Sequence, residues 1–199
     1  MPVYPGTEPP AIRRANTVER DGFAETLISM YSHTGTHVDA PAHMLAGSPT
    51  LDQYDAGRFI GPACVVDVSS PGTLVIGRPA LEACADLVAG CRFVLFHSGW
   101  SRYWGHDSYF SGFPVLSPDA ARWLTRRDLF GVGFDAISAD PVGPLAFENH
   151  FEFFRAGLLL VENLTGLGPL VGRRFTFSCL PLKLRDADGS PVRAVAMLD

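Results

Sequence analysis

The chain has 199 residues, of which 47% are hydrophobic and 19% are charged, and its formal net charge is −5. This composition is typical of one globular domain, and the acidic balance excludes an ordinary nucleic-acid binder, which carries a basic face. No apolar run approaches the ~20 residues of a membrane-spanning helix, and the first residues lack the pattern of a secretory signal. We therefore expect a single domain over residues 1–199 in the cytoplasm, with neither a nucleic-acid nor a membrane partner.

The first part of the chain predicts an arm followed by a strand. Residues 1–21 are rich in proline and polar side chains, and we expect an extended N-terminal arm with little structure of its own. From Phe23 to Tyr31 the residues alternate as in a β-strand, which leads straight to His33.

Residues 61–97 predict a strand–helix–strand unit. Two apolar stretches at 61–69 and 92–97 are typical of strands. Between them, residues 78–90 have a proline near the start, apolar residues at helical spacing and a glycine at the end, which predicts a helix.

The second half of the chain alternates further helices and strands. Residues 98–113 are rich in aromatic residues and glycine and predict a long loop, after which Ser117, Pro118 and Asp119 are typical of a helix start. The remaining predicted elements are strands at 131–137, 158–162, 175–184 and 192–198, a short helix at 150–156, and a hairpin turn at Asp188–Gly189. The predicted fold class is mixed α/β.

The cysteines give no sign of a disulfide framework. Cys64, Cys84, Cys91 and Cys179 form no Cys-x-x-Cys pair, and most lie in apolar surroundings. We expect buried, reduced thiols, as in a cytosolic protein.

One segment carries the residue types of a metal site. Three of the six histidines fall between His33 and His43, with Asp39 among them, and histidine and aspartate are common ligands of Zn²⁺ or Mn²⁺. On a straight strand His33 and His37 would lie about 13 Å apart, so they can share an ion only if the chain bends. Gly35 can supply that bend by adopting a left-handed conformation. The spacing predicts a strand end bent around a metal, and the alternative is a polar loop with scattered histidines.

Further ligands have to come from other parts of the chain. Glu162 follows an apolar run, and a carboxylate at the end of a buried strand is costly unless it is paired or bound to a cation. Its alternative role is an ion pair with Arg155, Arg173 or Arg174. Of the other histidines, we expect His97 to be structural and His106 to lie on the surface.

The run from His33 to His43 resembles the His-x-Gly-Thr-His-x-Asp-x-Pro-x-His signature of the cyclase family, which includes bacterial kynurenine formamidases and isatin hydrolases. Other similar segments cover most of the chain, and they are Pro2–Gly6, Ser98–Trp100, Trp104–Gly105, Gly133–Pro141, Val161–Leu164 and Asp188–Ala194. The resemblance implies the swivelling β/β/α fold of that family, assembled as a homodimer or homotetramer.

The resemblance also implies roles for individual residues. His33, His37 and Asp39 would hold one metal ion, and Asp39 would bridge to a second ion held by His150 and Glu162. The ion would be Zn²⁺, with Mn²⁺ as the alternative, in one or two copies per subunit. His43, the last residue of the motif, would be the catalytic general acid and base.

The implied reaction is hydrolysis of an amide bond by metal-activated water, with an aryl formamide such as N-formyl-L-kynurenine as substrate. This would be an arylformamidase of tryptophan catabolism. Two alternatives stay open: a lactam such as isatin or another substrate of the family, and a metal-stabilised binding protein without turnover. Tyr4, Trp100 and Trp104 belong to a set of aromatic residues that either line a pocket for a flat substrate or pack in the core and loops.

Overall fold

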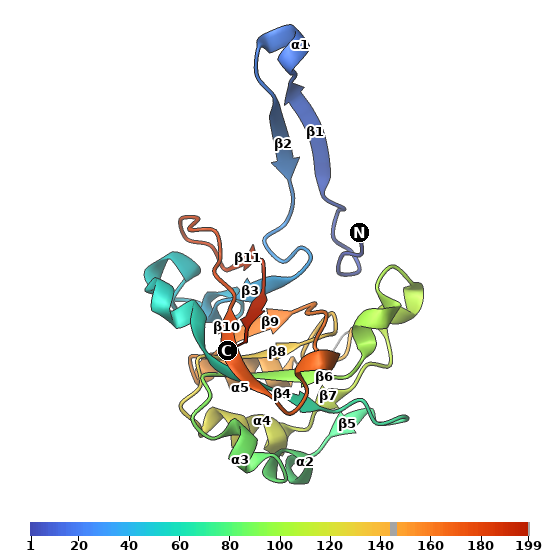
Figure 1. Ribbon diagram of the computed structural model, residues 1–199, viewed down its shortest axis with the longest axis vertical. Helices are drawn as coiled ribbons and strands as arrows, with labels where there is room; N and C mark the ends of the chain where they lie inside the picture. The colour runs from blue at the N-terminus through green and yellow to red at the C-terminus, as the bar shows by residue number, and fades with distance from the viewer. Residues whose placement is uncertain (144–146, 199) are drawn as a thin grey trace.

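A mixed eight-stranded sheet forms the centre of the molecule (Figure 1), of which the computed structural model describes residues 1–143 and 147–198. From edge to edge its strands are β11 (Gly189–Pro191), β3 (His37–Asp39), β9 (Leu159–Glu162), β8 (Gly131–Phe134), β6 (Phe93–His97), β4 (Ile60–Asp67), β10 (Arg174–Ser178) and β12 (Val195–Met197). Strands β4, β6, β8 and β9 are mutually parallel, and the two strands on either side of them pair antiparallel. The predicted mixed α/β fold class is confirmed.

Both faces of this sheet are buried in hydrophobic clusters. Helices pack against one face, and they are α2 (Arg78–Glu82), α3 (Ala85–Val88), α4 (Pro118–Thr125) and α5 (Glu148–Arg155). Strand β4 shows the alternation: Cys64 and Val66 belong to the cluster on the helical side, whereas Ala63 and Val65 belong to the cluster on the other side. None of the helices in the described ranges is long and apolar enough to cross a membrane.

The predicted strand–helix–strand unit is confirmed, because β4 and β6 are parallel neighbours joined through α2 and α3. The prediction of a single helix over residues 78–90 is wrong in one respect. Cys84 is not helical (φ −104°, ψ 13°), so the segment forms the two helices α2 and α3. Helix α4 begins as predicted, with the Ser117 hydroxyl accepting a hydrogen bond from the backbone N–H of Ala120. The aromatic loop after β6 holds two short 3₁₀ helices, at Trp100–Tyr103 and Asp107–Phe110.

The N-terminal arm has more structure than the sequence predicts. Strand β1 (Ala11–Asn16) pairs antiparallel with β2 (Glu25–Ser29), and the short helix α1 (Val18–Asp21) joins them. This hairpin projects away from the rest of the molecule (Figure 1). The predicted strand over residues 23–31 is therefore confirmed. Its partner β1 lies in the segment expected to lack structure, because the prolines and charged residues there do not give the alternating pattern of a strand.

The C-terminal segment corrects two boundaries. Strand β10 ends at Ser178 and does not continue to residue 184, and the turn lies at Arg185–Asp186 instead of at Asp188–Gly189. Gly189 belongs to strand β11 and pairs with Asp39 of β3. A side chain at position 189 would meet the ring of His33 at 2.5 Å, so glycine is needed here for close packing and not for a turn. A small parallel sheet, β5 (Val75–Ile76) with β7 (Val115–Leu116), completes the fold.

Candidate metal centre and active site

The bend predicted at Gly35 brings the first histidine back to the strand. Gly35 has a φ of +68°, in the left-handed region that favours glycine. As a result the rings of His33 and His37 lie with centroids 5.2 Å apart, and Nδ1 of His33 lies 2.7 Å from Oδ1 of Asp39. His37 and Asp39 are both on β3, two residues apart, and Nε2 of His37 is 3.2 Å from the same Asp39 oxygen. The three residues predicted to share one ion are thus together.

The register of the sheet brings Glu162 to the same place. His37 of β3 is paired with Glu162 of β9, and Nε2 of His37 lies 3.6 Å from Oε2 of Glu162. Helix α5 supplies His150, whose Nε2 lies 3.4 Å from Oε1 of Glu162. Among the described residues Glu162 has no arginine partner, so the ion pair with Arg155, Arg173 or Arg174 is not formed.

The donor atoms form three sets that fit divalent cations. His33, His37 and Asp39 offer one ligand atom each, all within 4.8 Å of one another, and so do Asp39, His150 and Glu162. The third set consists of His33, His43 and Asp188. Asp39 and Glu162 are only 1% and 5% exposed, and uncompensated buried carboxylates are strongly unfavourable. Nitrogen and oxygen donors of this kind suit Zn²⁺ or Mn²⁺, and Asp39, which belongs to the first two sets, can bridge two ions.

The charges of these groups depend on one another. Burial works to lower the pKa of His33, but Asp39 and Asp188 outweigh it and raise that pKa to about 9. His150 is raised to about 10, because its hydrogen bonds to Asp140 and Glu162 outweigh its burial. Burial alone would raise the pKa of Asp39, yet His37 and His33 hold it well below its usual range. Without a metal ion the site therefore carries protons on the histidines that would have to bind one.

Acceptors behind the histidines fix which ring nitrogen faces the centre. Nδ1 of His37 donates to the carbonyl of Gly35 at 2.8 Å, which leaves Nε2 toward Asp39 and Glu162. Nδ1 of His150 donates to Oδ2 of Asp140 at 2.6 Å, which leaves its Nε2 toward Glu162. Such acceptors orient metal-binding histidines and make them more basic.

Asn163, which directly follows Glu162, holds the bend from behind. Its side-chain amide donates to the carbonyl of Gly35 at 2.9 Å, and its amide oxygen accepts a hydrogen bond from the buried Tyr109 hydroxyl at 2.7 Å. The aromatic loop is thereby connected to the bend that carries the predicted metal ligands His33 and His37.

A cavity of about 320 Å³ opens onto these residues. Its wall is formed by Tyr4, Thr7, Tyr31, His33, His37, Asp39, His43, Met44, Ile137, Ser138, Phe147, His150 and Glu162. Tyr4 is one of these wall residues, and its contact with substrate stays a prediction. Trp100 and Trp104 do not line this cavity within the subunit, because they pack instead around Tyr103, Tyr109 and Phe113 in the aromatic loop. Contact of these two tryptophans with substrate stays a prediction.

His43 stands at the edge of the metal centre. It ends the 3₁₀ helix Pro41–His43, and its ring lies 3.9 Å from that of His33, centroid to centroid. Burial, together with the positive charge of His33, lowers the pKa of His43. A largely neutral imidazole beside a cavity can both accept and donate a proton near pH 7.

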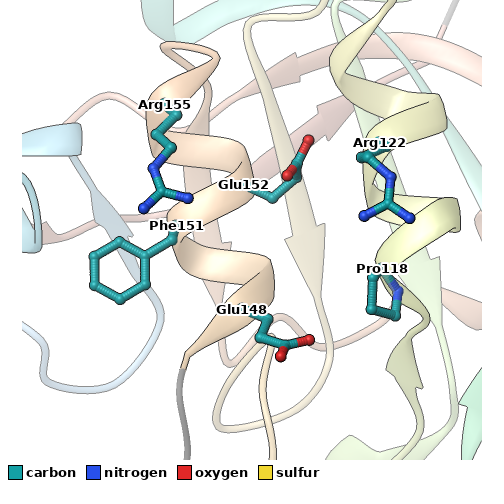
Figure 2. A pocket seen from close by; sticks show the side chains of 6 residues that line it. All are labelled: Pro118, Arg122, Glu148, Phe151, Glu152 and Arg155. Carbon is teal, nitrogen blue, oxygen red and sulfur yellow. The ribbon is translucent and has the colours of Figure 1, made fainter.

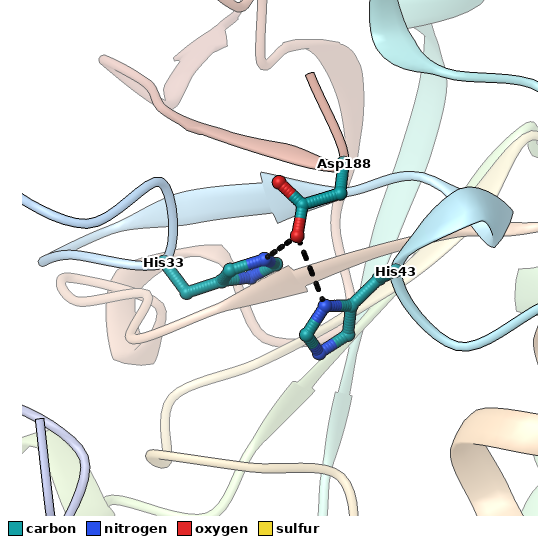
Figure 3. A group of neighbouring side chains, drawn as sticks. All are labelled: His33, His43 and Asp188. Carbon is teal, nitrogen blue, oxygen red and sulfur yellow. Dashed lines mark hydrogen bonds and ion pairs between the residues drawn. The ribbon is translucent and has the colours of Figure 1, made fainter. Parts of the chain in front are cut away.

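Sequence reasoning missed two carboxylates of the site. Asp140 holds His150, and Asp188 lies beside His33 and His43 (Figure 3). Both lie in segments that resemble the family, the Ser-x-Asp turn and the C-terminal Asp-Gly-Ser-Pro segment. Only that resemblance could have indicated them, because their partners are far apart in the sequence.

A second hollow lies on the outer surface of α4 and α5 (Figure 2). Arg122, Glu148, Glu152 and Arg155 line it, so it offers mixed charges and no histidine or aspartate. This hollow lacks the donor set of the metal centre.

The other predicted histidines and cysteines lie outside the site. His97 approaches Asp135 behind the aromatic loop, and His106 is exposed. All four cysteines are free, and three of them are buried, as expected.

Comparison with known proteins agrees with this geometry. Residues 1–141 match the family model described as "Putative cyclase". A kynurenine formamidase of Geobacillus thermodenitrificans (strain NG80-2) is 32% identical over 195 residues, which cover 98% of this chain and 90% of that protein.

Solved structures share the fold. An isatin hydrolase bound to the product analogue thioisatinate superposes with a TM-score of 0.86 at 25% identity, covering 96% of this chain and 82% of that one. A protein of Bacillus stearothermophilus, described as a predicted metal-dependent hydrolase, gives a TM-score of 0.78 at 28% identity and covers 98% and 91%. A binding protein without turnover does not fit such relatives. The chain therefore belongs to the cyclase family and is a metal-dependent hydrolase of amide bonds.

Proposed function

We propose that the chain hydrolyses an aryl formamide, with N-formyl-L-kynurenine as the substrate to test first. The observation that carries this proposal is the continuity of the His, Asp and Glu cluster with a cavity walled by Tyr4, Tyr31 and Phe147. Such side chains can pack against a flat aromatic ring while its amide reaches the polar end. The formamidase relative, similar over nearly its whole length, supports the same substrate class.

In this proposal His33, His37 and Asp39 hold one divalent cation, and Asp39, His150 and Glu162 hold a second where two are bound. Zn²⁺ is the first candidate and Mn²⁺ the second. When bound, the cation lowers the pKa of a water molecule and polarises the substrate carbonyl.

The remaining proton transfer belongs to His43. Water adds its oxygen to the formyl carbon, the C–N bond breaks, and a proton from that water has to reach the leaving nitrogen. His43 lines the cavity beside the metal centre, and its lowered pKa keeps it ready to accept that proton and donate it onward. The products are formate and an aryl amine.

The test is turnover of N-formyl-L-kynurenine by the purified protein, followed as kynurenine appearance. We expect activity that is lost on chelation and restored by Zn²⁺ or Mn²⁺, with the circular dichroism spectrum largely unchanged throughout. A fully metallated protein without turnover would reject this substrate. Unfolding on chelation would instead indicate a structural metal.

Isatin is the second candidate substrate, because an isatin hydrolase superposes over nearly the whole chain. Ring opening of a lactam uses the same carbonyl addition and C–N cleavage, but the carboxylate and amine stay on one product. Assaying isatin beside the formamide, with the same metal series, separates the two substrates by kcat/KM.

We also propose that the protein works in the cytoplasm as a homodimer or homotetramer. Large hydrophobic side chains that the described part of the chain exposes gather mainly on two surfaces, the arm and the β12 edge. The arm surface comprises Ile12, Val18, Phe23, Leu27, Ile28, Met30 and Tyr31, and the edge surface comprises Leu180, Leu182, Leu184, Val195, Met197 and Leu198. A two-stranded hairpin is marginally stable alone, so packing of the arm of one copy on the edge of another would stabilise both.

Charged substitutions test this assembly. We expect Leu27→Asp on the arm and Leu182→Asp on the edge each to shift the protein toward monomer in analytical ultracentrifugation. Leu74→Asp is the matched control, since Leu74 is also exposed but lies outside both surfaces. A monomeric wild-type protein, or an oligomer that survives both substitutions, would contradict the proposed packing.

A further inference from the structure

The carboxylate of Asp188 lies between two histidines of the site (Figure 3). Its Oδ2 is 3.0 Å from Nε2 of His33 and 3.4 Å from Nδ1 of His43, and its Oδ1 accepts a hydrogen bond from the Ser32 hydroxyl at 3.0 Å. One carboxylate therefore contacts both a predicted metal ligand and the predicted proton carrier.

The backbone around Asp188 is held firmly against the metal-binding strand. The carbonyl of Asp188 accepts a hydrogen bond from the N–H of Ala40 at 2.8 Å, and the next residue, Gly189, pairs with Asp39. Because Gly189 has no side chain, β11 can approach the ring of His33 closely. The position of the carboxylate is thus set by the same β3 backbone that carries the metal ligands.

The orientation of the two rings follows from these contacts. His33 turns Nδ1 toward Asp39 and the metal centre, while its Nε2 faces Asp188. His43 turns Nδ1 toward Asp188, which leaves its Nε2 without a hydrogen-bond partner among the described residues and available to the cavity. A carboxylate behind an imidazole fixes both the ring orientation and the nitrogen that carries the proton.

Asp188 differs from the acceptors behind the other histidines. Among the histidine rings of the described residues, the carbonyl of Gly35 contacts that of His37 alone, and the buried Asp140 contacts that of His150 alone. The side chain of Asp188 is 44% exposed and serves two rings. It lies on the open side of the site, next to His43, where orientation of the proton carrier matters.

We propose that Asp188 is a positioning residue that holds His43 with Nδ1 protonated and Nε2 directed at the substrate. This proposal rests on the proposed function for its kinetic consequence, because His43 is the proton carrier there. It does not rest on that function for the orientation of the rings. His33, His43 and Asp188 could also hold a cation together, but in this proposal Asp188 acts through His43 and binds neither the metal nor the substrate.

The first test is kinetic and uses the metal-loaded full chain with Asp188→Asn. The neutral amide lacks the negative charge that favours a proton on Nδ1 of His43, so we expect kcat to fall about 10- to 100-fold, as for other carboxylates behind ligating histidines. We expect KM and metal content to stay near the wild-type values. Asp188→Glu should recover part of the loss, and Asp186→Asn, an exposed carboxylate two residues away, is the matched control.

The second test reads the histidines directly and needs no substrate. In ¹H–¹⁵N spectra of metal-loaded protein, we expect His43 as the Nδ1–H tautomer in the wild type and a loss of that preference in Asp188→Asn. An unchanged tautomer would overturn the proposal. Loss of one metal equivalent in Asp188→Asn would also overturn it, because Asp188 would then be a ligand. If wild type fails to cleave the formamide, the proposed substrate fails while the tautomer still decides the role of Asp188.

Discussion

The candidate metal centre has an inner side and an outer side that differ in burial and in the elements that carry them. Asp39, His150 and Glu162 form the inner side, all buried, on strand β3, helix α5 and strand β9. His33, His43 and Asp188 form the outer side, all partly exposed, on the segments that flank β3 and β11. The inner groups are held by sheet register and the core, so they can bind cations in a fixed geometry. The outer groups face the cavity, where substrate and water enter.

The largest effect is expected on the inner side, at the residue shared by both ligand sets. Asp39→Asn removes the negative charge of a residue that belongs to both sets proposed to hold an ion. The buried Glu162 and the histidines then lose a charged neighbour that helps to bind the cations. We expect loss of bound metal, measured by elemental analysis, and turnover at background. Asp107→Asn, an exposed carboxylate, is the control. Retention of two metal equivalents by Asp39→Asn would contradict the bridging assignment.

The next effect is the pH dependence of metal affinity. Histidines on both sides of the site bind protons when the metal is absent. The pKa of His33 is raised to about 9 and that of His150 to about 10, so both are protonated at neutral pH in the metal-free protein. A metal ion must displace these protons, so apparent affinity should increase as pH rises from 6 to 8, about tenfold per pH unit for each proton displaced. Calorimetry in buffers of different ionisation enthalpy counts the protons. Metal affinity independent of pH would show that these histidines are not ligands.

The smallest expected effect is on KM, and it distinguishes Tyr4 from Trp104, two residues that the sequence analysis placed in the same aromatic set. Tyr4 lines the cavity and Trp104 does not. Tyr4→Ala should raise KM for an aromatic amide by about tenfold, the scale of one lost apolar contact in a pocket. Trp104→Ala should change KM by no more than about twofold, as for an ordinary surface substitution. Equal effects of the two substitutions would mean that Trp104 reaches the substrate after all, for example across a subunit contact.

The sequence predicted more of the inner side of the site than of the outer side. The bend at Gly35 was predictable because the spacing of His33, His37 and Asp39 demands it over seven residues. Glu162 was conspicuous because a carboxylate ends an apolar run. Its pairing with His37 depends on strand register, which the structure supplies.

Most contacts of the outer side could not be predicted from the sequence, because they join residues that are far apart in the chain. Asp188 lies 155 residues from its partner His33, and Asp188–Gly189 is a typical turn sequence that is used here for close strand packing. The arm was missed for another reason. Its first strand has few of the residues that mark strands, and its apolar side chains face solvent within the subunit.

The most direct test of the central claim is the metal content and kcat of His43→Asn, with exposed His106→Asn as the control. His43 lies on the outer side and is the proposed proton carrier, whereas the inner side, His33 and His37 are proposed to hold the metal. We therefore predict wild-type metal content with kcat for the formamide reduced about 10²- to 10⁴-fold. A His43→Asn protein that keeps its kcat, or that loses its metal together with its activity, would contradict this division of labour.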